Sequence, residues 1–235
     1  MSAVVEVVER KPLANEVGAF AQSTTKANEV DFVQFPGLYY ENYAAQMAAV
    51  FLHKAGGKMP VLKLMSLMYL TERLHLQKRY NGITYDAFVS MKHGSVLYRT
   101  NLLVFGMAKS SPKTNRGDSR GWPQWISAIS NDEVSLVDQS LLESPSLRNV
   151  LNRGSHEAIN EVWGQFGFLR THELSAHTKA LPEWVDPGDQ AFLPIAYPDL
   201  FKAIGFSQEA SSDVLDVFEE RADIARGREL AMVNA

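Results

Sequence analysis

The chain has 235 residues, of which 46% are apolar and 21% charged, and its formal net charge is −4 at pH 7. A chain of this length and composition can bury a core, and its acidic balance argues against a broad nucleic-acid-binding surface, which needs excess lysine and arginine. The lack of cysteine excludes disulfides, thiolate metal sites and thiol nucleophiles. Apolar runs such as AAVFL at 48–52 are far below the ~18 residues of a membrane span. We therefore expect a soluble, cytoplasmic protein.

The first part of the chain divides into an irregular segment and two expected helices. Residues 1–37 mix valine pairs with small and polar residues and end at the breaker Pro36-Gly37, so we treat them as an extension of uncertain order. Apolar residues then recur every three or four positions over 38–54, which predicts a helix. A second helix is expected over 60–80, and its two apolar faces predict a place at the centre of the core.

A small sheet is expected after these helices. Residues 88–91 have the pattern of a short strand, after which Gly94 lets the chain bend and Ser95 can cap a helix over 96–105. Two short apolar runs within 125–137 flank an Asn-Asp turn, which is typical of a β-hairpin. We expect these strands to form one antiparallel sheet.

Helices are expected again in the second half of the chain. They run from Ser155 to Gly167, from Thr171 to Ala180, from Pro198 to Ala203 and from Ser212 to about Arg226. The sequence therefore predicts a mainly α fold with a small antiparallel β-sheet (α+β), as a single compact helical domain with a β-hairpin. We divide it into an N-terminal extension (1–37), a core (38–190) and C-terminal helices that pack on the core (191–235).

The chain has none of the sequence motifs that mark phosphate-binding loops, dinucleotide sites, nucleophile elbows or zinc proteases. The closest histidines, His172 and His177, are five residues apart, which separates them on a helix, whereas a metal-binding pair on one helix needs a spacing of four. We therefore expect no catalytic residue, no cofactor and no metal ion.

The stretch MKHGSVLYR at 91–99 has two interpretations. If Gly94 and Ser95 begin a helix, their amides could hold a phosphate or carboxylate beside Lys92 and His93. In the other interpretation Gly94 bends the chain, Ser95 caps the next turn and the polar neighbours face water. We favour the second, because a few residues that fit a strand-to-helix turn specify little more.

Three segments of the chain carry a resemblance to a known family. The first, at 63–99, reads KLMSLMYLTERLHLQKRYNGITYDAFVSMKHGSVLYR. The second reads WISAISNDEVSLV, and the third, at 151–184, reads LNRGSHEAINEVWGQFGFLRTHELSAHTKALPEW. In this order and at these separations they resemble the SocA-like antitoxins, or Panacea domain. The chain departs from the family pattern in a turn one residue shorter at 80–83 and at four residues: Glu72, Tyr85, Ser95 and Lys179.

The resemblance implies a function. Such proteins are antitoxins that neutralise a toxin encoded nearby by direct protein–protein binding, without a cofactor or known catalytic residue. The alternative is a proteolytic adaptor that delivers the toxin to an ATP-dependent protease. A hydrolase or nucleotide-binding enzyme that uses 92–95, and a DNA-binding autorepressor, are less favoured. The expected partner is thus a cognate toxin protein, and neither a membrane nor nucleic acid is expected.

Two groups of residues are candidates for partner contact. Those within the family motif are polar: Glu72, Arg73, Lys92, His93 and Arg99. Outside the resemblance, the extension is the first choice because it offers apolar anchors: Val4, Val5, Val7 and Val8. The basic loop 107–121 and the acidic last helix are the other choices.

Overall fold

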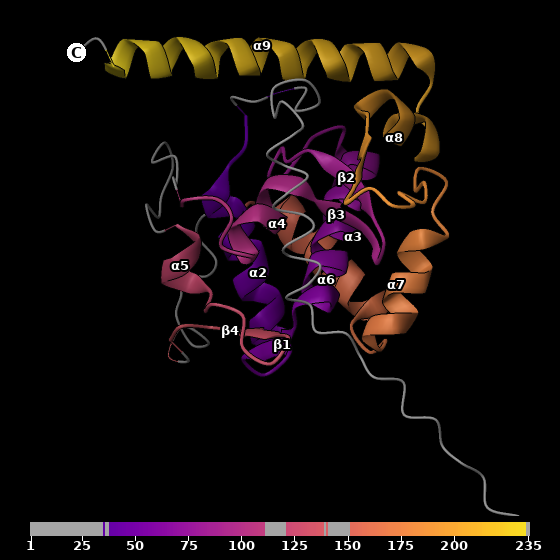
Figure 1. The fold of residues 1–235 in the computed structure, drawn as a ribbon. Coiled ribbons are helices and arrows are strands. Elements are labelled where there is room, and N and C mark those ends of the chain that lie inside the picture. The colour runs from indigo at the N-terminus through magenta and orange to yellow at the C-terminus, as the bar shows by residue number, and fades with distance from the viewer. Residues whose placement is uncertain (1–34, 36–37, 111–120, 139, 141–150, 234–235) are drawn as a thin grey trace, which may run out of the picture.

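A computed structural model describes residues 35, 38–110, 121–138, 140 and 151–233. The protein is mainly helical with small antiparallel sheets, which confirms the predicted α+β class (Figure 1). The helices are α2 (Glu41–Lys54), α3 (Val61–Arg79), α4 (Tyr98–Val104), α5 (Trp122–Trp125), α6 (Arg153–Phe166), α7 (Thr171–Lys179), α8 (Tyr197–Ala203) and α9 (Gln208–Val233). The strands are β1 (Lys58–Pro60), β2 (Phe88–Met91), β3 (Gly94–Leu97), β4 (Glu133–Ser135) and β5 (Leu193–Ile195).

Helix α3 lies at the centre of the fold, as its two apolar faces predict. It packs against α2, α6, α7 and β3. Apolar side chains on several sides of the helix, such as Leu64, Met65 and Met68, are buried. Pro60 precedes α3 as the last residue of β1, so the helix begins one residue later than expected.

The predicted single sheet was wrong in its strand pairing. Strand β2 pairs with β3 and with β5, and Val89 lies opposite both Val96 and Pro194. Strand β4 instead pairs with β1 in a separate sheet. Two of the missed strands, β1 and β5, are three residues long and contain a proline, so neither shows the alternating pattern by which a strand is recognised.

The segment 125–137 keeps part of its predicted hairpin form. Bridges between Ile126 and Leu136 and between Ser130 and Glu133 enclose the expected turn. The first predicted run is not a strand, however, because Trp125 ends the short helix α5. The hairpin is therefore attached to α2 and β1 and takes no part in the sheet of β2.

Helix α9 is longer than the predicted 212–226 and lies along one edge of the molecule, with α8 beside its N-terminal end (Figure 1). Its fully buried Phe218 lies in an aromatic cluster: ring centroids of four residues, Phe35, Tyr85, Tyr197 and Phe201, lie 5.0–6.4 Å from its own. Phe35, from the segment expected to be an extension, is thus buried in the core. No helix in the described part of the chain is long and apolar enough to cross a membrane.

Candidate functional site

Glu72 is fully buried in α3, where its carboxylate bonds the backbone of a neighbouring turn. Its Oε1 accepts hydrogen bonds from the N–H groups of Ile83, Thr84 and Tyr85 at 2.9, 3.0 and 3.1 Å. These amides precede β2, and Tyr85 has a left-handed backbone conformation with φ of 55°. Glu72 therefore provides the acceptor that these buried amides need.

The pKa of Glu72 is raised from its ordinary value of 4.5 to about 7, mainly by burial and also by the nearby Asp86, while the three backbone hydrogen bonds oppose the change. Burial also raises the pKa of Asp86, and it lowers the pKa of His75. The core of this protein thus contains carboxyl groups whose protonation affects folding.

We expect the Glu72 carboxyl to make folding less favourable as pH rises from about 4.5 to about 7. The folded protein retains a proton there that the unfolded chain has already released, so stability present below pH 4.5 is lost as pH passes the folded pKa of about 7. The loss attributable to this group is about 3 kcal/mol. Urea unfolding at a series of pH values checks this, with Glu72→Gln as the matched variant because its amide oxygen still accepts the backbone bonds.

The difference in unfolding free energy between the wild type and Glu72→Gln isolates this carboxyl from Asp86, which acts in the same direction, and from His75, which acts in the opposite one. That difference should grow in favour of the variant across the pH range. Parallel profiles for the two proteins would contradict the assignment.

Asp86 is also fully buried, and it caps helix α4. Its carboxylate accepts from the N–H groups of Arg99 and Thr100, both at 2.8 Å, and from the Thr100 hydroxyl at 2.7 Å. An aspartate side chain therefore occupies the position at the helix N-terminus where an anion would bind.

Arg73, the residue that follows Glu72 in α3, forms a buried ion pair. Its Nε lies 2.6 Å from Oε1 of Glu183, and the Glu183 side chain is fully enclosed. The Tyr69 hydroxyl donates to the same oxygen at 2.7 Å, so this carboxylate has two donors from α3. The bonds tie α3 to the segment that follows α7.

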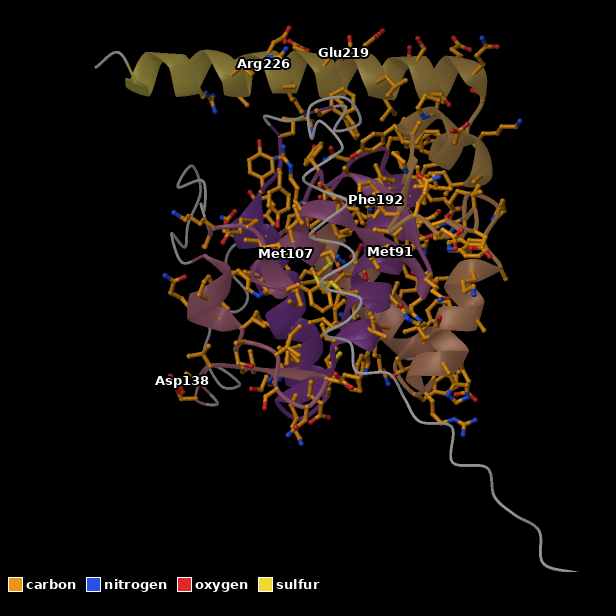
Figure 2. All side chains as sticks on the ribbon, in the orientation of Figure 1. Met91, Met107, Asp138, Phe192, Glu219 and Arg226 are labelled. Atoms are coloured by element: carbon orange, nitrogen blue, oxygen red, sulfur yellow. The ribbon has the colours of Figure 1, made fainter. Side chains whose placement is uncertain are left out.

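The β2–β3 hairpin packs on α7 through its backbone. Lys92 and His93 form the turn, Lys92 is exposed and His93 is half-buried. The His93 carbonyl accepts from the Ser175 hydroxyl at 2.7 Å, and Trp184 donates its ring N–H to the carbonyl of Met91 at 3.1 Å. Met91, labelled in Figure 2, is the last residue of β2.

Gly94 is required where this hairpin meets α7. Its φ of 114° disfavours any side chain, and a Cβ atom there would lie 2.1 Å from the Thr178 hydroxyl oxygen. Ser95 follows within β3, so the prediction that it caps a helix over 96–105 was wrong. The reason is tertiary: Val96 and Leu97 pair with β2, and α4 starts only at Tyr98. The turn therefore lacks the helix N-terminus on which an anion-binding interpretation depended.

Arg99 lies on the first turn of α4, over the Tyr39 ring at 5.7 Å from its centroid. The Tyr39 hydroxyl shares a 3.2 Å hydrogen bond with Thr100. This arrangement joins α4 to the residues that precede α2.

The five polar residues predicted from the motif therefore belong to separate networks. Glu72 and Arg73 bond inside the protein, Lys92 and His93 form a hairpin turn, and Arg99 lies against a tyrosine. Their contact with a partner stays a prediction. The apolar anchors at 4–8 and most of the loop 107–121 lie outside the described residues.

Sequence reasoning did not single out Asp86 and Glu183, two further buried carboxylates, although both lie inside the segments that carry the resemblance. Asp86 follows NGITY, and Glu183 is the acid of PEW. Their position within a motif was the available signal. It could not show that each has backbone or side-chain donors far away in the sequence.

Of three comparisons with known proteins, one gives a match. Neither the curated proteins nor the solved structures give a match. The sequence model of one family, described as "Antitoxin SocA-like, Panacea domain", matches residues 64–185. The match covers more than half of the chain and includes Glu72, Asp86 and Glu183. The chain therefore belongs to the SocA-like antitoxin family and contains its Panacea domain.

Proposed function

We propose that this protein neutralises a cognate toxin, encoded nearby, by binding it directly. The observation that carries the proposal is the family match over 64–185. The internal hydrogen bonds of Glu72, Asp86 and Glu183 support a scaffold role for the buried motif residues. Toxin contact would then use surfaces that this scaffold presents.

Several surfaces are open to such contact. The exposed Lys92, the half-buried His93 and Arg99 remain proposed contacts within the Panacea domain. The valine pairs of the N-terminal extension remain the proposed apolar anchors. A truncation that tests those valines has to retain Phe35, because its ring packs on Tyr197 and Phe218 in the core.

The proposal is tested by expressing the product of the adjacent reading frame alone and together with this protein. We expect that product to stop colony formation and co-expression to restore it, because a bound toxin cannot reach its target. The two proteins should co-purify, and the amount of tagged toxin should be unchanged. Failure of co-expression to restore growth from a toxic neighbour would contradict the proposal.

The same experiment separates direct neutralisation from the adaptor alternative. An adaptor lowers the amount of toxin, and deletion of the responsible ATP-dependent protease brings both the toxin and the growth arrest back. Rescue with constant toxin in a protease-deficient strain supports direct neutralisation.

A further inference from the structure

A groove lies between the end of α3 and the first half of α9. It has a volume of about 420 Å³ and is lined by Tyr80, Ala210, Asp213, Val214 and Val217. The Tyr80 ring stacks on Phe206, with 4.6 Å between centroids, yet 54% of the residue is exposed. This open tyrosine face, within the Panacea match, and the adjacent Val217 of α9, outside the match, form a partly apolar surface.

Helix α9 extends this surface as an apolar stripe. Val217 and Ile224 are 41% and 49% exposed and are seven residues apart, with Ala210 seven residues before them. Residues at this spacing lie on one face of a helix. Helices that pair along a heptad pattern have two apolar positions in every seven residues, and this stripe supplies one of them, while Asp213 and Glu220 occupy the other.

The charges on one side of the stripe are all acidic, whereas the exposed Arg221 and Arg228 lie on its other side, where Arg221 donates to Asn81 and Tyr85. Four exposed carboxylates follow the adjoining outer side of α9: Glu209, Asp213, Asp216 and Glu220. Among the residues that the structure describes, none of the four forms an ion pair. A partner with the opposite charge would compensate them.

We propose that this groove and stripe bind a cationic amphipathic helix of the cognate toxin, an inference that rests on the proposed antitoxin function. Apolar residues of that helix, at seven-residue spacing, cover Tyr80, Val217 and Ile224. Its lysine and arginine side chains lie beside Asp213 and Glu220. Apolar burial supplies the affinity, and the charges select the partner and speed its association.

Other candidate partners match the negative charge on this side of α9 less well. A second copy of this chain, paired through α9 about a two-fold axis, would bring these carboxylates against their own equivalents, and like charges disfavour such an interface. Residues 1–34 of the chain carry five acidic and three basic side chains, so they would add negative charge to an acidic surface. Nucleic acid is repelled for the same reason.

The test measures binding of the adjacent reading frame's product to the full-length protein and two matched variants. Asp213→Lys/Glu220→Lys reverses two charges beside the groove. Ser212→Lys/Glu219→Lys, the control, changes two exposed residues with the same spacing on another side of α9, where Figure 2 labels Glu219. The first variant adds four positive charges and the control three. Circular dichroism verifies that both are folded.

We expect Asp213→Lys/Glu220→Lys to raise the dissociation constant at least about tenfold, mainly through slower association, and to lose protection in the colony assay. The control should bind and protect as the wild type does. Added salt should slow association of the toxin with the wild type and the control more than with the groove variant.

Three results would contradict the groove assignment, and each has a different meaning for the proposed function. If the wild type protects and the groove variant binds and protects equally well, the groove assignment is overturned and the antitoxin function stands. If the wild type itself neither binds nor protects, the proposed function fails and the groove assignment fails with it. A wild-type dimer that the groove variant disrupts, with toxin binding unchanged, would assign the surface to a second copy and overturn the proposal.

Discussion

Replacement of Arg73 by methionine should lower the free energy of unfolding by about 3–5 kcal/mol, because it leaves a buried carboxylate without its cation. The Glu183 side chain is fully enclosed, and Arg73 is its ion-pair partner at 2.6 Å. The remaining donor, the Tyr69 hydroxyl, is neutral and does not compensate the charge. Urea unfolding monitored by circular dichroism measures the loss.

The control for this prediction is the double variant Arg73→Met/Glu183→Gln. It removes both charges while the glutamine oxygen can still accept from Tyr69, so it should recover most of the lost stability. A double-mutant cycle gives the coupling between the two residues. Equal losses in the single and double variants would show that packing of the arginine, and not its charge, stabilises this site.

Replacement of Phe218 by alanine should cost about 3–5 kcal/mol, because this ring is the centre of the aromatic cluster that attaches α9 to the core. Loss of the ring leaves a cavity beside Tyr85 and Tyr197. The second attachment in this region, the Arg221 bond to Asn81 at 2.6 Å, lies at the surface and contributes far less. Thermal unfolding and amide hydrogen exchange along α9 measure the effect.

Val217→Ala is the matched control, because it shortens the neighbouring residue on the exposed side of the same helix. It should change stability by no more than about 0.5 kcal/mol. Amide hydrogen exchange in α9 should be faster in Phe218→Ala than in the wild type. In Val217→Ala it should equal that of the wild type. Unchanged exchange and unchanged stability in Phe218→Ala would show that other contacts hold the helix.

Helix positions in this protein follow from local information. The apolar spacing over 60–80 predicts α3 and its central place, and Gly167 marks the end of α6 as expected. Helix starts are predicted less well, since α6 begins at Arg153, capped by Asn152, and not at the expected Ser155. Such features depend on residues within a few turns of one another, which is the range over which periodicity and capping act.

Strand pairing is determined by contacts between distant parts of the chain. Strands β1 and β5 are short and contain Pro60 and Pro194, so each is recognisable only from its partner. At 94–97 the partner strand β2 is close in the sequence, separated by Lys92 and His93 alone, and its pairing prevails over the helix that the local pattern favours. A backbone hydrogen bond to a remote strand stabilises an extended conformation that short sequences do not specify.

For the buried carboxylates, too, the sequence predicts one part and the folded structure determines the other. The sequence places Glu72, Asp86 and Glu183 within family motifs, and that resemblance already indicates the antitoxin family. Their environments arise only on folding, because Glu72 bonds amides 11 to 13 residues away and Glu183 bonds an arginine 110 residues away. Burial and hydrogen bonding are properties of the folded arrangement, so residue identity predicts membership of the family but not which charges the core encloses.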